Sequence, residues 1–141
     1  MRFMIIVKAT ADSEAGRFPD DPEPVFAAMA AYHEELAKAG VLLDGSGLQP
    51  SSKGWRVQYD AGGKRTIVDG PFTESKELVA GYTLIQTRTR DEAIEWSRRF
   101  PNPVNEGVPG HIEVRQLYEM EDFEGMLQPE TSERFRDIGM G

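Results

Sequence analysis

The sequence predicts one α+β domain whose strands and helices follow the order β-α-β-hairpin-β-α-β. The run at residues 3–7 is apolar at every position, as in a buried strand. Between Asp21 and Gly40 the apolar residues recur every three or four positions, which indicates a helix. Residues 55–59 alternate apolar and polar side chains and residues 65–69 are rich in β-branched ones, with a glycine-containing turn between them. This order is the split βαβ, ferredoxin-like arrangement with an extra hairpin in its middle.

The elements before the hairpin follow from local signals. Residues 10–24 hold many polar, glycine and proline positions, and they predict a long loop. The pair Asp21-Pro22 suits the start of the first helix and Gly40 suits its end. Residues 41–44 are expected to form a short strand that enters the segment Gly45-Ser46-Gly47.

The elements after the hairpin complete the pattern. Residues 79–87 predict a strand, and Thr89 with Glu92 forms a capping-box pattern that opens a second helix. Pro101 ends that helix, and residues 112–118 give the last strand. We expect a domain at residues 1–120 and an acidic tail at residues 121–141, either packed on a dimer or partly disordered.

The first strand also predicts a homodimer. Phe3, Ile5 and Val7 point to one side of this strand, while Met4 and Ile6 point to the other. Such a strand is apolar on both faces, yet two helices cover only one face of a small sheet. The second face therefore needs another layer, which a second copy of the chain can supply.

Composition excludes several classes of protein. The chain has 141 residues, a net charge of −8 and no cysteine. This charge disfavours nucleic acid as a partner, and no apolar run approaches the ~20 residues that span a bilayer. Without cysteine there is no disulfide framework and no thiolate nucleophile, in agreement with a cytoplasmic protein. Two histidines far apart in the sequence make a weak metal site, so we expect neither a metal nor a cofactor.

His33 is the first candidate for chemistry, because it lies at the edge of the apolar face of the first helix. One interpretation is a partly buried histidine that makes a hydrogen bond, and the other is a general base that faces a cleft between helix and sheet. In the second case, Asp44 is the carboxylate expected to orient His33.

Asp69 and the residues that follow it form a second group of candidates. Asp69 at a strand end either accepts hydrogen bonds from the amides of the next turn or acts as an acid in a pocket. In the pocket interpretation Glu74, Lys76 and Tyr82 would help to bind a small polar ligand.

The segment Asp69-Gly70-Pro71-Phe72-Thr73-Glu74-Ser75-Lys76-Glu77, with Gly81-Tyr82 after it, resembles the DGPF signature of the YCII-related family. The resemblance implies a ferredoxin-like domain of the dimeric α+β-barrel superfamily. Most family members have no established reaction, while some relatives act on lactones or halogenated ring-cleavage products. Simpler members are suggested to pair a histidine on the first helix with an aspartate, and that position falls near Met29, about one turn before His33.

Two functional hypotheses stay open. The first is a protein that binds a small polar metabolite in a pocket between sheet and helices, with cofactor-independent acid/base chemistry on a carbonyl or lactone. The alternative is a non-catalytic regulatory or interaction module, because the resemblance also implies an association with alternative sigma factors. An enzyme needs a closed pocket, whereas an interaction module needs an exposed apolar patch.

Overall fold

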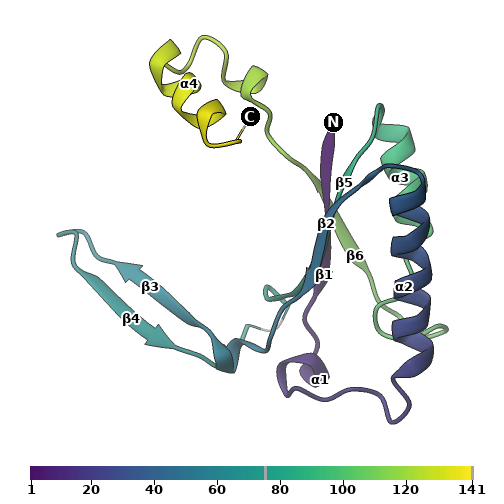
Figure 1. The fold of residues 1–141 in the computed structure, drawn as a ribbon. Helices are drawn as coiled ribbons and strands as arrows, with labels where there is room; N and C mark the ends of the chain where they lie inside the picture. The colour runs from purple at the N-terminus through teal and green to yellow at the C-terminus, as the bar shows by residue number, and fades with distance from the viewer. Residues whose placement is uncertain (75, 141) are drawn as a thin grey trace.

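A four-stranded antiparallel sheet with helices on one face forms the centre of the molecule (Figure 1). The computed structural model describes residues 1–74 and 76–140. The strands lie in the spatial order β2 (Leu42–Gly47), β5 (Val79–Gln86), β1 (Arg2–Lys8), β6 (Ile112–Gln116). Helix α2 (Glu23–Lys38) precedes β2, and α3 (Arg90–Arg98) precedes β6. This connectivity confirms the predicted ferredoxin-like fold.

The hydrophobic core lies between the sheet and the two helices. It is formed by buried side chains of both layers: Phe3, Ile5, Tyr32, Leu36, Ile85 and Ala93. Ile5, Leu36 and Ile85 are fully buried, and burying each such side chain stabilises the fold by about 1.5–3 kcal/mol. The alternate residues of β1, Met4 and Ile6, point to the opposite face, which neither helix covers.

Strand β2 is longer than the sequence predicts. It continues through Gly45 and Gly47, which pair with Thr83 and Gly81 of β5. A side-chain Cβ at Gly45 would lie only 3.3 Å from the carbonyl oxygen of Tyr82. Glycine therefore permits a close approach here, and the predicted end of the strand at position 44 was wrong.

The predicted loop at residues 10–24 contains a one-turn helix, α1 (Ala11–Glu14). The amide of Ser13 donates to the hydroxyl of Thr10 at 3.1 Å, and the amide of Thr10 donates to the hydroxyl of Ser13 at 2.8 Å. This reciprocal capping stabilises the turn, and a loop prediction based on polar composition overlooked it.

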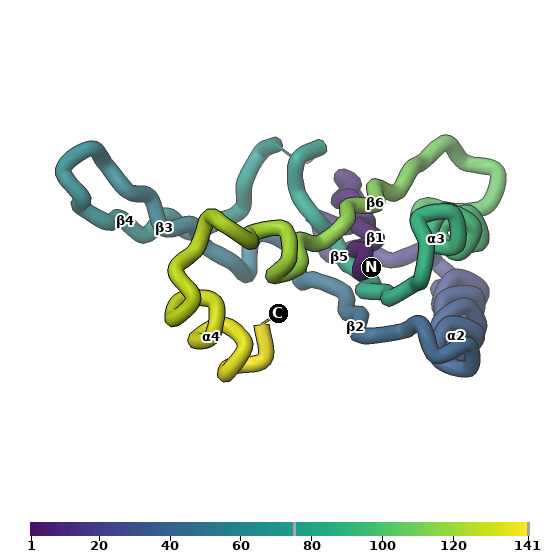
Figure 2. Tube along the Cα trace, turned by 90° about the horizontal axis from the view of Figure 1, so that it is seen from above, coloured from purple at the N-terminus to yellow at the C-terminus, as the bar shows by residue number. Residues whose placement is uncertain are grey.

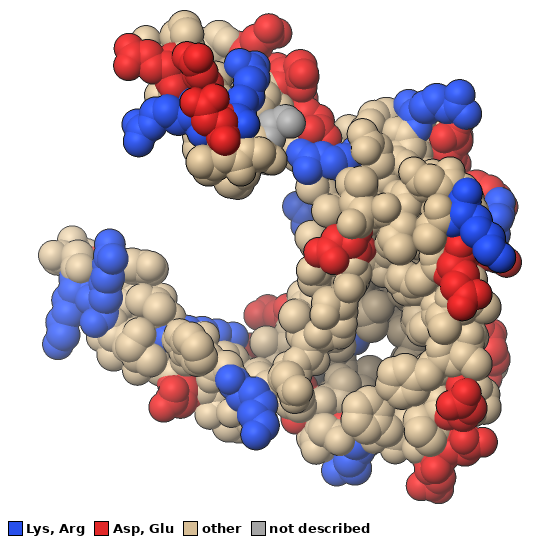
Figure 3. Space-filling view, viewed as in Figure 1, with Lys and Arg blue, Asp and Glu red and all other residues tan. Residues whose placement is uncertain are grey.

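Two further parts project from the uncovered side of the sheet (Figures 1 and 2). Strands β3 (Trp55–Tyr59) and β4 (Arg65–Asp69) form a separate hairpin at the predicted positions, and we call residues 55–69 the hairpin arm. Residues 117–140, the C-terminal arm, contain a 3-10 turn (Met120–Phe123) and helix α4 (Pro129–Asp137). Figure 3 shows open space between the two arms.

None of the helices within the described residues has both the length and the apolar character needed to cross a membrane.

Candidate functional site

His33 lies on the face of α2 that packs against the sheet. Its Nδ1 atom is 2.7 Å from the carbonyl oxygen of Met29, and its Nε2 atom is 2.8 Å from the hydroxyl oxygen of Thr83. A carbonyl oxygen can only accept, so Nδ1 donates to Met29, and in the neutral ring Nε2 accepts from Thr83. Both ring nitrogens thus have partners inside the domain, which favours a structural role for His33.

The surroundings of His33 are aromatic. The ring of Tyr32 meets it edge-on at 5.5 Å, and the ring of Phe100 lies 6.3 Å away. The Tyr32 hydroxyl donates to the backbone carbonyl of Trp96 at 2.7 Å, and burial raises the pKa of Tyr32 to about 12. Among the described residues, no buried polar side-chain atom lacks a hydrogen-bond partner. The interface between α2 and the sheet is therefore closely packed, and its buried polar side-chain atoms have hydrogen-bond partners.

Asp44 lies on the opposite face of the sheet and does not orient His33, so that expectation was wrong. The hydroxyl of Tyr82 donates to Asp44 Oδ2 at 2.9 Å, and the amide of Gly45 donates to Asp44 Oδ1 at 2.8 Å. Tyr82 follows the pleat of β5, so its side chain points away from that of Thr83. The hydrogen bond to Asp44, together with its negative charge, raises the pKa of Tyr82, and the phenol stays protonated.

An apolar stripe lies beside the Asp44–Tyr82 pair on this open face. Ile6 is the cross-strand partner of Tyr82, and Met4 is the partner of Leu84. On the other side of the stripe, the ammonium group of Lys8 lies 3.8 Å from the carboxylate of Glu113. The open face thus combines a hydrogen-bonding pair at one edge with an apolar centre and charged groups at the other edge.

The turn after β4 is fixed by contacts with residues far away in the sequence. The amide of Gly70 donates to the carbonyl of Gly54 at 3.0 Å, and the amide of Phe72 donates to the hydroxyl of Ser51 at 3.0 Å. Ser51 is held in turn by the carboxylate of Glu14, which accepts from its amide at 3.0 Å and also from its hydroxyl. The peptide bond between Gly70 and Pro71 is cis. These contacts attach the base of the hairpin arm to α1.

Asp69 does not accept the amides of this turn, because Ser51 and Gly54 do. Asp69 ends β4 opposite Trp55, and Glu74 lies 3.5 Å from Arg56 of the hairpin arm. Lys76 is exposed. Within the part of the chain that the structure describes, no hydrogen bond or ion pair joins Asp69, Glu74 or Lys76 to the Asp44–Tyr82 pair. Their part in ligand binding stays a prediction.

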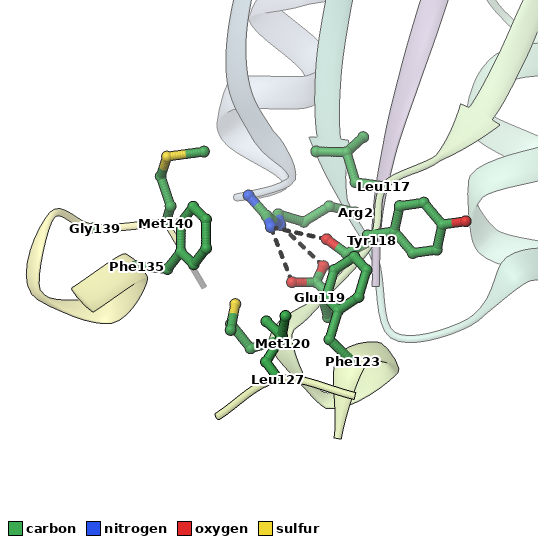
Figure 4. A pocket seen from close by; sticks show the side chains of 10 residues that line it. All are labelled: Arg2, Leu117, Tyr118, Glu119, Met120, Phe123, Leu127, Phe135, Gly139 and Met140. Atoms are coloured by element: carbon green, nitrogen blue, oxygen red, sulfur yellow. Dashed lines mark hydrogen bonds and ion pairs between the residues drawn. The ribbon is translucent and has the colours of Figure 1, made fainter. Parts of the chain in front are cut away.

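A hollow of about 540 Å³ lies between the end of β6 and the C-terminal arm (Figure 4). Arg2 donates from Nε and Nη2 to the two carboxylate oxygens of Glu119, both at 2.9 Å. The hydrogen bond from Arg2 lowers the pKa of Glu119. The other lining side chains are mainly apolar and come from the C-terminal arm: Leu117, Met120, Phe123, Leu127, Phe135 and Met140. The spaced apolar residues of the tail were the sequence signal for this hollow, but they did not show that it faces Arg2.

No three histidine, aspartate or glutamate side chains of the described residues gather closely enough to hold a metal ion.

Comparisons with known proteins found a family, a sequence relative and a solved structure that are similar to this chain. Residues 1–121 match the model of the YCII-related domain, which leaves most of the C-terminal arm outside the match. Uncharacterized protein R00369 of Rhizobium meliloti (strain 1021) is 32% identical over 98 residues, which cover 70% of this chain and 77% of that protein. A solved structure of 5-chloro-2-hydroxyhydroquinone dehydrochlorinase (TftG) from Burkholderia phenoliruptrix AC1100, in complex with 2,5-dihydroxybenzoquinone, is 18% identical. It has a TM-score of 0.44 and covers 84% of this chain and 95% of its own.

Proposed function

Starting from the fact that the chain belongs to the YCII-related domain family, we propose that it binds a small polar metabolite at Asp44 and Tyr82. The observation that carries this proposal is the 2.9 Å hydrogen bond between the two side chains on an otherwise partly apolar open face. Sites for small molecules commonly combine a few polar groups with apolar walls. The proposed site thus lies on the open face of the sheet rather than between the sheet and the helices.

The two side chains offer complementary hydrogen-bonding groups. When a ligand binds, the Tyr82 hydroxyl would turn its single proton from Asp44 to a ligand carbonyl oxygen, and the freed carboxylate oxygen of Asp44 would accept a hydrogen bond from a ligand hydroxyl. A compound with adjacent hydroxyl and carbonyl groups satisfies both. Its carbon skeleton would contact Met4, Ile6 and Leu84 of the apolar stripe.

The same pair supports acid/base chemistry without a cofactor. Asp44 would remove a proton from the carbon next to the carbonyl group, and Tyr82 would protonate the carbonyl oxygen, which gives an enediol. Asp44 then gives its proton to the former carbonyl carbon, while the Tyr82 phenolate takes the proton of the other hydroxyl group. This produces the isomeric hydroxycarbonyl compound and restores both side chains, so atoms and charge balance. His33 takes no part in this scheme, because both of its ring nitrogens have partners inside the domain.

A homodimer completes the proposed site. The open face carries apolar side chains that the helices do not cover, and a second copy packed on this face would shield a ligand from water. Shielding strengthens the hydrogen bonds of Asp44 and Tyr82 with the ligand, because water no longer competes for them.

A thermal-shift screen against hydroxyketones, lactones and 2-oxo acids tests the proposal. We expect a compound that raises the melting temperature of the wild type but has little effect on Tyr82→Phe or Asp44→Asn. Tyr118→Phe serves as the matched control, because it removes a phenol hydroxyl from an exposed side chain and should leave the shift unchanged. A ligand that stabilises all four proteins equally would place binding elsewhere.

The alternative function is a non-catalytic module that binds an alternative sigma factor. Exposed apolar side chains of the C-terminal arm, among them Met126 and Ile138, favour this alternative. Co-elution of the protein with a purified alternative sigma factor in size-exclusion chromatography would support it. An Ile138→Ser variant should then lose the complex, and separate elution of the wild-type proteins would exclude this role for that factor.

A further inference from the structure

The hairpin arm leaves one apolar face uncovered by its own chain. On its other face, the guanidinium group of Arg56 lies 3.8 Å from the ring centre of Phe72 and 3.5 Å from Glu74. The uncovered face carries four large side chains that neighbour one another across the two strands: Trp55, Val57, Tyr59 and Ile67. Trp55 is 64% exposed and Ile67 is 61% exposed. An isolated two-stranded hairpin is marginally stable in water, so this face requires a cover.

The C-terminal arm has a matching hollow. Six apolar side chains line about 540 Å³, and Figure 4 shows them around the Arg2–Glu119 ion pair. The two arms extend from the same side of the sheet, but open space separates them within one chain (Figures 1 and 3). Both arms thus carry apolar surface, and both extend from the side of the sheet where a second copy would lie.

The charges of the two arms are opposite. The hairpin arm and the lysine just before it carry four basic side chains against two acidic ones, namely Lys53, Arg56, Lys64 and Arg65 against Asp60 and Asp69. The C-terminal arm carries seven acidic side chains against two basic ones: Glu119, Glu121, Asp122, Glu124, Glu130, Glu133 and Asp137 against Arg134 and Arg136. Figure 3 shows mostly blue side chains on the hairpin arm and a concentration of red ones on the C-terminal arm. Opposite charges favour contact between unlike arms, and like arms would repel each other.

We propose that each copy in a dimer packs the apolar face of its hairpin arm into the C-terminal hollow of the other copy. This arm exchange rests on the homodimer proposed above, and two-fold symmetry then makes the contact twice. The apolar side chains of both arms become buried, while the basic hairpin lies beside the acidic arm. The exchange gives a function in assembly to the residues of the C-terminal arm that lie beyond the match to the YCII-related domain, which ends at residue 121.

Tryptophan fluorescence tests the exchange, because the chain has only Trp55 and Trp96. A Trp96→Phe variant leaves Trp55 as the sole reporter on the hairpin arm. In the dimer we expect its emission to shift to shorter wavelength and its quenching by acrylamide to fall at least twofold, relative to the same variant diluted to monomer. Light scattering measures the dimer separately, so a dimer in which Trp55 stays fully quenchable refutes the exchange without refuting the dimer.

A mixing experiment shows which copy covers Trp55. The reporter protein is mixed with an excess of a tryptophan-free partner (Trp55→Phe, Trp96→Phe) that also carries Phe135→Ser in its hollow. The exchange predicts that Trp55 becomes more accessible to acrylamide, although its own chain has an intact arm. The matched control is the tryptophan-free partner with an unchanged hollow, which should preserve the protection. Equal protection with both partners would mean that Trp55 is covered by its own chain or by the other hairpin, and it would overturn the proposal.

Discussion

Replacement of Thr83 by valine tests whether His33 is a structural residue. Thr83 is only 2% exposed, and valine keeps the shape of its side chain while removing the hydroxyl that lies 2.8 Å from His33 Nε2. A hydrogen bond contributes about 0.5–1.5 kcal/mol net, and a buried group left without a partner costs about 1–3 kcal/mol. Because His33 is only partly buried, water can reach its ring in part. We therefore expect a loss of about 1–2 kcal/mol in the free energy of unfolding.

Urea denaturation followed by circular dichroism measures this loss. The urea concentration at the midpoint of unfolding should fall, while the slope of the unfolding free energy against urea concentration stays the same. The melting temperature should drop by roughly 3–8 °C for a chain of this size. Thr66→Val is the matched control, since Thr66 is exposed on the hairpin arm. It makes the same chemical change and should alter stability by less than about 0.5 kcal/mol.

Two results would refute the structural role of His33. The first is a Thr83→Val protein as stable as the wild type, which would mean that the hydrogen bond to His33 contributes nothing. The second is unchanged stability with loss of ligand binding, which would return His33 to the group of catalytic candidates. Retained ligand binding with reduced stability is the outcome that our assignment requires.

Two further predictions concern the base of the hairpin arm and the C-terminal hollow. In Gly70→Ala the new Cβ would overlap the carbonyl oxygen of Ser51, so the backbone must shift. We expect a loss of about 1–3 kcal/mol in the free energy of unfolding and faster hydrogen exchange of the hairpin amides. Gly47→Ala is the control, because a Cβ at this position would have no atom within 4 Å apart from those of Gly47 and its two chain neighbours. Equal effects of the two changes would contradict this account. The ion pair with Arg2 lowers the pKa of Glu119 below its ordinary value of 4.5. The ion pair therefore contributes about 0.5–1 kcal/mol to the free energy of unfolding. This contribution is complete above pH 4.5 and disappears as the pH falls through the lowered pKa of Glu119. Urea midpoints of the wild type and Arg2→Met should therefore differ at pH 7 and converge in acid, whereas a pH-independent difference would exclude the ion pair as its cause.

The fold could be predicted from the sequence because its main signals are local. The apolar spacing between Asp21 and Gly40 gives α2, and the segments 55–59 and 65–69 give the hairpin with the bounds that the structure shows. Strand β2 was predicted too short because glycines usually mark turns. Its pairing with β5 depends on a close approach of two backbones, which no local pattern displays.

The candidate site was predicted only in part, because the face of a strand depends on its register. Asp44 follows the first helix closely in sequence, which suggested a contact with His33. The pleat and an irregularity between Leu42 and Asp44 direct its carboxylate to the open face instead. Tyr82 was expected to line a pocket, but its hydrogen bond to Asp44 joins two strands that are far apart in sequence.

The position of the Asp44–Tyr82 pair connects ligand binding with assembly. Both side chains lie on the face that we expect a second copy to cover, so the free monomer presents only an open half of the proposed site. If only the dimer binds, the apparent dissociation constant equals the intrinsic constant divided by the fraction of protein in the dimer. Ligand affinity should then weaken in proportion as the protein is diluted below its dimer dissociation constant. A monomer that binds as tightly as the dimer would mean that Asp44 and Tyr82 form the site without the second copy, and shielding by the partner would then have no part in binding.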